Sequence, residues 1–137
     1  MTPEELATLH AKCFTTPRPW SASEFAGLQN STFVLTASHG FLMGRVIADE
    51  AELLTLAVDP TARRQGVGRY LVEAFKSRAG QDGAVTAFLE VAADNAAAIS
   101  LYQATGFNGA GVRRGYYRRA DSTTLDALVM RCELGDR

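Results

Sequence analysis

The sequence predicts an α/β fold, and three observations favour it. Two capped helical segments open the chain, three apolar runs with strand character follow, and the remaining elements alternate between helix and strand. The predicted order is ααβββαβαββ. Because the sequence contains no internal repeat, low-complexity tract or linker, we expect residues 1–137 to form one domain.

The N-terminal segment carries two helix-start patterns. "TPEE", residues 2–5, combines a capping residue, a proline at the first helical position and a glutamate at the third, which predicts a helix over 3–14. Prolines at 17 and 19 end it. "WSASEF", residues 20–25, repeats the capping pattern, and Trp20 can pack on Phe25 as a hydrophobic staple. This second helix should end near residue 30.

The next segment reads as three strands. "TFVLTAS" (32–38) and "FLMGRVIA" (41–48) flank a tight turn at "HG". We interpret "DEAE" (49–52) as a polar turn, followed by the strand "ELLTLAV" (52–58), which Asp59-Pro60 closes.

The second half alternates helix and strand. After the loop 63–69 comes a helix with Val67, Leu71, Ala74 and Phe75 on one face, ended by Gly80 or Gly83. The strand 84–92 precedes a helix over 96–105, capped by Asp94 or Asn95 and ended by Gly106. Two final strands are predicted around 110–117 and 125–134.

Composition limits the class of protein. With 47% apolar and 21% charged residues and a net charge of −1, the chain resembles an ordinary soluble protein that holds neither nucleic acid nor membrane by bulk charge. No apolar run approaches the roughly 20 residues of a membrane span, and the N-terminus is unlike a signal peptide. We therefore expect a cytoplasmic protein, with nothing that demands more than a monomer.

Cysteine and histidine spacing argues against a metal site. Cys13 and Cys132 lie far apart, and with His10 and His39 they form no cluster of the kind that zinc requires. We expect two free thiols and no bound metal.

The segment "RRQGVGR", residues 63–69, places three arginines and two glycines between a strand and a helix. A solvated turn is one interpretation. The position favours another, because free N–H groups and the helix dipole at a helix N-terminus attract an anion such as a phosphate. The nucleotide motifs do not fit: no G-x-x-x-x-G-K-[ST] string exists, and Leu71 stands where a dinucleotide fingerprint needs its third glycine.

The loop does fit the pattern R/Q-x-x-G-x-G/A directly behind "AVDP", and so resembles the GNAT family of acyl-CoA-dependent N-acetyltransferases. The resemblance implies a GNAT-type mixed central sheet flanked by helices, with acetyl-CoA as acetyl donor. It implies that Leu56, Ala57 and Val58 lie along the pantetheine arm and that the Val58 N–H stabilises the oxyanion. The residues implied at the pyrophosphate are Arg63, Arg64, Gln65, Gly66, Val67, Gly68 and Arg69.

A second motif narrows the resemblance. The pattern N-x-x-A-x-x-x-Y-x-x-x-G-F occurs from Asn95 through Tyr102 to Phe107, with "LEV" before it and "RRGYY" after it. Together with "PRPWS" (17–21), these motifs resemble the ribosomal-protein-alanine N-acetyltransferases. That implies acetylation of the α-amine of an N-terminal alanine on a small-subunit ribosomal protein.

The chemistry needs a base and an acid. A chain-terminal amine has a pKa of about 7.7–8.0 and must lose a proton before it attacks a thioester. Glu90, a carboxylate in an apolar strand, is the candidate base, although a strand glutamate can also simply pair with an arginine. Tyr102, matched to the motif, is the candidate acid for the thiolate, although a tyrosine at that spacing can also simply pack on the core.

The acceptor side is less defined. The resemblance implies that Tyr116 and Tyr117 contact the peptide. The basic and aromatic residues of "RRGYYRR" (113–119) could also form a nucleic-acid binding patch, but the net charge of −1 argues against nucleic-acid binding. Trp20 is either an acceptor wall or only a staple, and Asn95 a cap, a ligand of the pantetheine arm, or both. The sequence leaves open whether the acidic run 49–52 lines the groove.

Three functions remain open. The first is acetylation of a protein N-terminal alanine. The second is acetylation of a small-molecule amine or a lysine side chain by the same fold. The third, a non-catalytic acetyl-CoA-binding module, is disfavoured because both Glu90 and Tyr102 are present.

Overall fold

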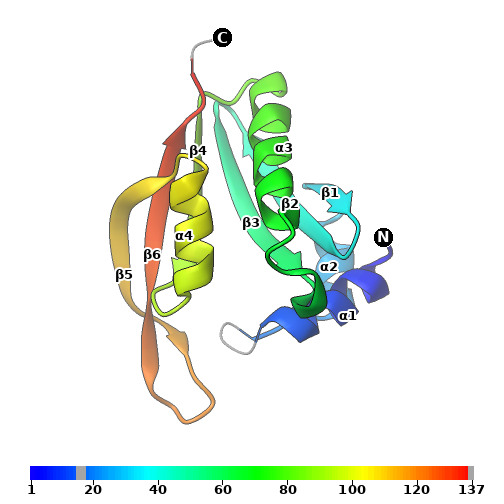
Figure 1. Ribbon diagram of the computed structural model, residues 1–137, viewed down its shortest axis with the longest axis vertical. Helices are drawn as coiled ribbons and strands as arrows, with labels where there is room; N and C mark the ends of the chain where they lie inside the picture. The colour runs from blue at the N-terminus through cyan, green and yellow to red at the C-terminus, as the bar shows by residue number, and fades with distance from the viewer. Residues whose placement is uncertain (15–17, 136–137) are drawn as a thin grey trace.

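The structure is a computed structural model that describes residues 1–14 and 18–135 (Figure 1). The order ααβββαβαββ is confirmed, with one short 3-10 helix added at Pro60–Ala62. The helices are α1 (Pro3–Cys13), α2 (Ala22–Leu28), α3 (Val67–Gln81) and α4 (Ala96–Ala104). The strands are β1 (Phe33–Ala37), β2 (Gly40–Ile47), β3 (Glu50–Val58), β4 (Thr86–Ala92), β5 (Asn108–Arg118) and β6 (Thr124–Glu133).

The six strands form one mixed sheet in the order β1-β2-β3-β4-β6-β5. β3 and β4 at its centre are parallel, whereas the other neighbouring pairs are antiparallel. The parallel ladder is short: it joins Glu50–Leu53 to Thr86–Leu89 and no further residues of either strand. The two halves of the sheet therefore separate beyond Leu53 and Leu89.

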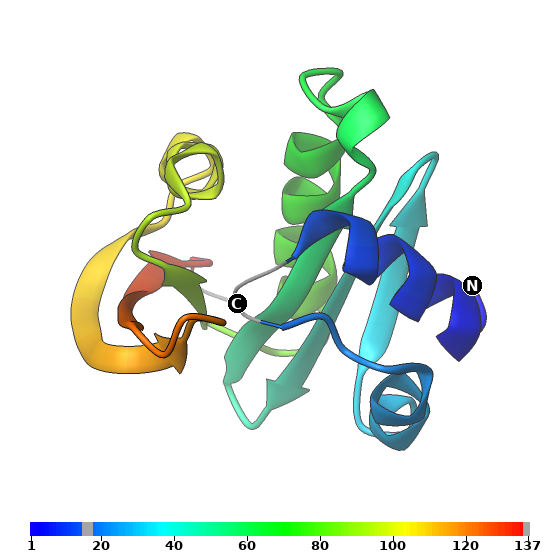
Figure 2. The same cartoon turned by 90° about the horizontal axis from the view of Figure 1, so that it is seen from below.

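Helices cover both faces of the β1–β3 half (Figure 2). Strand alternation explains this, because successive side chains of β2 point to opposite faces. Phe41 and Met43 pack with Leu6, Leu9 and Phe25 of α1 and α2. Their neighbour Leu42 belongs to the other cluster, with residues of α3.

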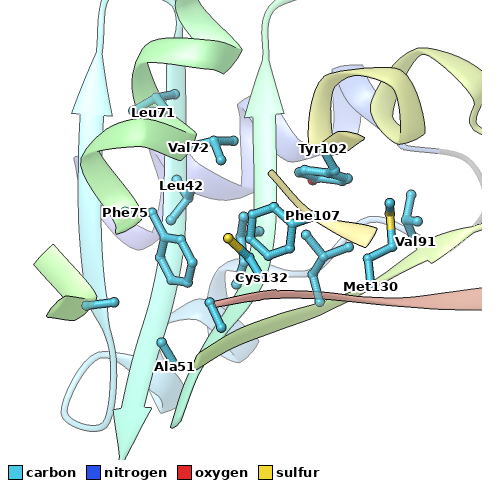
Figure 3. Close-up of a cluster of buried hydrophobic side chains, with 14 of the residues drawn as sticks. Leu42, Ala51, Leu71, Val72, Phe75, Val91, Tyr102, Phe107, Met130 and Cys132 are labelled. Atoms are coloured by element: carbon cyan, nitrogen blue, oxygen red, sulfur yellow. The ribbon is translucent and has the colours of Figure 1, made fainter. Parts of the chain in front are cut away.

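That second cluster continues from α3 to the far half of the sheet (Figure 3). Phe75 of α3, Phe107 after α4 and Met130 of β6 are each at most 2% exposed. Tyr102 of α4 lies beside Phe107 in this cluster, with ring centroids 5.9 Å apart. The core thus fixes α3 and α4 beside each other, on either side of the place where β3 and β4 separate.

The predicted caps are confirmed. Thr2 and Glu5 form a reciprocal capping box at α1, and Ser21 and Glu24 form another at α2. Asn95, and not Asp94, caps α4: its Oδ1 accepts the N–H of Ala98 at 3.2 Å. The staple between Trp20 and Phe25 is also present, with ring centroids 5.3 Å apart; Pro17 of the motif "PRPWS" lies outside the described residues.

Several boundaries differ from the prediction by one or two residues. The polar turn predicted over 49–52 is wrong, because β3 already begins at Glu50 and only residues 48–49 turn. Glu50 and Glu52 alternate with the buried Ala51 and Leu53, so their polarity marks one strand face. α2 ends at Leu28, before the expected residue 30. Of the two glycines predicted to end α3, Gly83 is the one that does so: the helix passes through Gly80 to Gln81, and Gly83 takes a positive φ of +96°.

In the described part of the chain, no helix is long and apolar enough to cross a membrane.

Candidate active site

A cleft opens where β3 and β4 stop pairing. Its volume is about 1160 Å³, and its walls come from α1, β3, the loop before α3, β4, α4 and β5. Figure 1 shows these elements converging on the side of the sheet where the two central strands diverge. A cavity of this size accommodates a ligand larger than a typical drug molecule.

The backbone of β3 turns alternate N–H groups toward this cleft. The N–H of Asp59 donates to the carbonyl of His39, next to the start of β2, at 2.7 Å. Because the N–H groups of a strand alternate between its two neighbours, those of Val58 and Leu56 point away from β2. The Val58 carbonyl also points away from β2, since it accepts a hydrogen bond from Nε of Arg63 at 3.4 Å. The Val58 N–H therefore faces the open side of β3.

The N-terminus of α3 differs from those of the other helices. Side chains of Thr2, Ser21 and Asn95 cap α1, α2 and α4, but α3 starts after Gly66 with no side-chain hydrogen bond at its cap. Gly66 adopts φ +80°, a conformation that a glycine takes without strain. The N–H groups of the first turn are thus free for an anion, which the helix dipole also attracts.

Three arginines surround this helix end. Arg63, Arg64 and Arg69 are exposed, line the cleft and form no ion pair with the described residues. Their charges add to the dipole of α3 at the same end of the cleft. This end therefore favours a polyanion.

The two glycines of the loop serve different purposes. A Cβ on Gly68 would lie 3.0 Å from Cδ2 of Leu101, so the absence of a side chain lets α3 approach α4. A Cβ on Gly66 would meet no atom within 4 Å, so only the positive φ favours glycine at this position. Packing between the helices thus constrains Gly68.

Glu90 lies on the opposite wall of the cleft, in the part of β4 that pairs with β6 but no longer with β3. Its Oε1 accepts a hydrogen bond from Nη1 of Arg113 at 2.8 Å, so the arginine pairing considered from the sequence does occur. Its Oε2 is buried and has no partner among the described residues. Glu90 therefore keeps one oxygen able to accept a proton or a hydrogen bond.

Tyr102 reaches the cleft from α4 while its ring packs in the core. It is 6% exposed and lies edge-on to Phe107. Burial, with a smaller contribution from Tyr117, raises the pKa of the Tyr102 phenol well above its ordinary value of 10. The phenol is consequently a proton donor throughout the neutral range.

The end of β5 brings aromatic groups to the same place. A register shift between Arg113 and Tyr117, with Gly115 at φ +60° and its N–H bonded to Asp126, bends the strand here. Tyr116 and Tyr117 lie with ring centroids 5.0 Å apart and both line the cleft. Burial, followed by the charge of Glu90, raises the pKa of Tyr117 to about 12. Opposite them, Trp20 closes the cleft from the N-terminal side.

A polyanion site, a carboxylate and a protonated phenol thus share one cleft, and comparisons with known proteins agree. Residues 4–107 match the model of the acetyltransferase (GNAT) family. The chain belongs to the GNAT family of acetyltransferases.

Individual GNAT relatives extend the match. The chain is 43% identical over 118 residues to the [ribosomal protein bS18]-alanine N-acetyltransferase of Escherichia coli K12, covering 82% of this chain and 79% of that protein. It is 34% identical over 144 residues to the N-alpha-acetyltransferase RimI of Mycobacterium tuberculosis, covering 97% and 87%. The crystal structure of the E. coli ribosomal-protein-S18-alanine N-acetyltransferase superposes with a TM-score of 0.85 at 36% identity, over 96% of this chain and 86% of that one.

The GNAT cleft gathers most of the residues singled out in the sequence. Those that line it are Trp20, Leu56, Val58, Arg63, Arg64, Gly66, Val67, Gly68, Arg69, Glu90, Asn95, Tyr102, Tyr116 and Tyr117. Two do not. Ala57 points to the opposite face, where it is 1% exposed among residues of α1 and α2, as the alternation of β3 requires. Gln65 is exposed beside the positive φ of Arg64 and lies outside the lining of the cleft.

Of the acidic run 49–52, Glu52 alone lines the cleft. Its Oε1 accepts from Nη2 of Arg45 at 2.7 Å. The run therefore contributes to the cleft one carboxylate, which is paired with an arginine.

His10 is a feature of the GNAT cleft that the sequence did not reveal. It is 1% exposed on α1, where Nδ1 accepts the backbone N–H of Trp20 at 3.0 Å and Nε2 lies 2.9 Å from Oγ1 of Thr55. Because Nδ1 is an acceptor, the proton resides on Nε2, which donates to Thr55. Burial lowers the pKa of His10 to about 4, so the ring is neutral at physiological pH. His10 thereby ties the Trp20 wall to β3.

Within the described residues, no group of three His, Cys, Asp or Glu side chains lies close enough to hold a metal ion. Cys13 and Cys132 are both free thiols.

Proposed function

We propose that this protein transfers an acetyl group from acetyl-CoA to the α-amine of a protein N-terminus, with alanine of a small-subunit ribosomal protein as the acceptor. The observation that carries the proposal is the arrangement of the cleft, with an uncapped, arginine-rich helix end at one side and Glu90 and Tyr102 beyond it. The names of the 43% and 34% identical relatives support the α-amine and the alanine acceptor.

Acetyl-CoA, the acetyl donor, fits the arginine-rich end of the cleft at the N-terminus of α3. The N–H groups of the first turn of α3, with Arg63, Arg64 and Arg69, hold the pyrophosphate of acetyl-CoA. From there the pantetheine arm follows the free edge of β3, where the backbone of Leu56 and Val58 can hydrogen-bond to it. The thioester then lies between β3 and β4. Asn95, already engaged as a helix cap, is a further polar group along this path.

The acceptor nitrogen attacks the thioester carbonyl carbon, forming a C–N bond. The Val58 N–H donates to the oxyanion of the tetrahedral intermediate. Glu90 takes the proton that the nitrogen loses, through its unpartnered Oε2 directly or through one water.

Collapse of the intermediate breaks the C–S bond, and the electron pair leaves on sulfur. Tyr102 gives its phenolic proton to that thiolate, and both groups recover their starting protonation by exchange with solvent. The phenol is protonated at neutral pH and therefore has a proton to give when the thiolate forms.

The acceptor enters on the side of Trp20, Tyr116 and Tyr117. These three rings line the cleft and provide the flat apolar surface that a peptide backbone packs against. An acceptor with a low amine pKa suits the site, because a lysine amine, at about 10.4, is harder to deprotonate than an α-amine.

Thiol release from acetyl-CoA with two peptides tests the proposal. One peptide begins with alanine and contains no lysine; the other has a blocked N-terminus and several lysines. We expect turnover with the first peptide and none with the second. Turnover with the second alone would make the protein a lysine acetyltransferase, and silence with both would indicate a small-molecule amine.

A further inference from the structure

Arg113 of β5 reaches across β6 to Glu90 of β4. Glu90 pairs with Val129 in the sheet and Arg113 pairs with Ala127, so a whole strand separates the two residues, yet Nη1 lies 2.8 Å from Oε1. The guanidinium carbon also lies 4.1 Å from the ring centroid of Tyr116. The bend of β5 at Gly115 accompanies this arrangement, which brings one cation to the carboxylate and to the aromatic wall together.

The pairing is part of a pattern. Three carboxylates line the cleft, and each has one arginine as its partner: Glu52 with Arg45 at 2.7 Å, Glu90 with Arg113 at 2.8 Å and Asp94 with Arg119 at 3.6 Å. The negative charge of each carboxylate in the cleft is therefore offset by the positive charge of an arginine. The arginines of the donor loop, in contrast, have no carboxylate partner among the described residues.

The remaining titratable groups around Glu90 do not supply this compensation. Tyr102, Tyr116, Tyr117, His10 and Cys13 line the cleft. The neighbouring strand β6 adds Asp126, Arg131, Cys132 and Glu133, and Arg131 is already paired with Glu133 at 3.4 Å. The two most buried tyrosines have raised pKa values and stay neutral, and His10 is neutral because burial lowers its pKa to about 4. Asp126, which accepts the Gly115 N–H, adds a negative charge.

A carboxylate whose charge is not offset would hinder an amine that must be neutral in order to act as a nucleophile. An opposite charge within roughly 4–6 Å favours the charged form of a titratable group. An uncompensated Glu90 would therefore hold the acceptor as an ammonium ion, which has no lone pair for attack. A cation on Glu90 removes this stabilisation but leaves Oε2 open to receive the proton.

We infer that Arg113 is a positioning residue that offsets the charge of Glu90, so that the acceptor amine is held in its neutral, nucleophilic form. The inference rests on the proposed function, because it assigns Glu90 as the base for an amine acceptor. Hydrogen bonding to Glu90 raises the pKa of Arg113 above its ordinary value, so the compensating charge persists at every pH of interest.

The test compares Arg113→Gln with Arg113→Lys and Arg114→Gln. Glutamine keeps a donor for Glu90 but removes the charge; lysine keeps the charge. Arg114, the exposed neighbour on β5, forms no ion pair with the described residues and is the matched control. Since the Arg113 side chain is 51% exposed, its replacement should not prevent folding, and a thermal unfolding scan of each variant checks this.

Two measurements are made on each protein. The first is the pH dependence of kcat with the alanine peptide, whose acid limb reports the protonation of the bound amine. We expect Arg113→Gln to move that limb upward by about one pH unit, which lowers kcat roughly tenfold at pH 7. Arg113→Lys and Arg114→Gln should follow the unmodified protein.

The second measurement is the affinity of the same peptide for the protein–CoA complex at pH 6, where the peptide amine is an ammonium ion. Arg113→Gln should bind it several-fold more tightly while reacting more slowly. A merely structural role for Arg113 predicts the opposite sign, a loss of affinity together with the loss of kcat.

An unmoved acid limb in Arg113→Gln, a weaker affinity at pH 6, or an equal shift in Arg113→Lys would each overturn the inference. Failure of the proposed function has a separate signature, because the unmodified protein would then acetylate a lysine or a small amine and ignore the alanine peptide. The same comparison with that amine would still decide the role of Arg113.

Discussion

The backbone N–H of Trp20 donates to Nδ1 of His10, ten residues earlier in the chain, at 3.0 Å. This bond uses one ring nitrogen of a buried histidine, and Thr55 of β3 uses the other. The Trp20 bond requires an unprotonated Nδ1, so the ring is neutral and its proton lies on Nε2, which donates to Thr55. The protonation of His10 is therefore coupled to folding and to the position of Trp20 in the wall of the cleft.

This coupling predicts a pH dependence of stability. His10 has a folded pKa of about 4 against an ordinary value of 6.5, so its contribution is complete above pH 6.5 and is lost as the pH falls from 6.5 to 4. The loss over that window is on the order of 3 kcal/mol. The free energy of unfolding, measured with urea at several pH values, should decrease less between pH 6.5 and pH 4 for His10→Gln than for the unmodified protein. His39→Asn, at an exposed turn, should leave the decline unchanged; equal slopes in all three proteins would contradict the assignment.

Replacement of Glu90, the proposed base, should affect the chemical step alone. Glu90→Gln keeps the shape and can still accept from Arg113, but it cannot take a proton, so we expect kcat to fall by roughly 10²–10⁴-fold at pH 7. The deficit should shrink above pH 9, where the α-amine is already neutral. Acetyl-CoA affinity, measured by calorimetry, should not change. A large loss of that affinity would instead make Glu90 a structural residue.

Replacement of the acid should leave the fold intact. Tyr102→Phe removes one hydroxyl and keeps the edge-on packing with Phe107, so the free energy of unfolding should change by no more than about 1.5 kcal/mol. We expect kcat to fall roughly 10²–10⁴-fold in the thiol-release assay. Tyr70→Phe, on the exposed side of α3, is the control and should retain full activity. Normal turnover by Tyr102→Phe would assign the tyrosine to packing only.

The glycine between α3 and α4 offers a test of the donor site. In Gly68→Leu the side chain meets Leu101 and moves the first turn of α3, so acetyl-CoA should bind at least tenfold more weakly. The control is Gly27→Ala in α2, where the added methyl meets no atom within 4 Å and the helix gains about 0.5–1 kcal/mol. Unchanged donor affinity in Gly68→Leu would place the pyrophosphate elsewhere.

The sequence predicted best what depends on neighbours three or four residues apart. The capping boxes of Thr2 and Ser21 and the cap at Asn95 are all of this kind, and each has a local pattern. The period of two also places the side chain of Ala57 on the face opposite Leu56 and Val58, so the sequence alone could have predicted that Ala57 does not line the cleft.

The long-range partners could not be predicted. Arg113 lies 23 residues from Glu90, and Thr55 lies 45 residues from His10. These contacts depend on the bend of β5 and on the height at which α1 crosses β3. Neither is encoded in a short pattern, and a single histidine on an apolar helix face gives no indication of its partner.

The four-residue ladder between β3 and β4 also determines how the amides of this protein should exchange with solvent. The N–H groups of Leu56 and Val58 face the cleft where β4 no longer provides acceptors, so their deuterium uptake should be fast although they lie in a central strand. A donor bound along that edge would supply the missing acceptors and slow the exchange. The substrate would then complete the hydrogen bonding of the sheet, and protection at two amides would report its presence before any chemistry occurs.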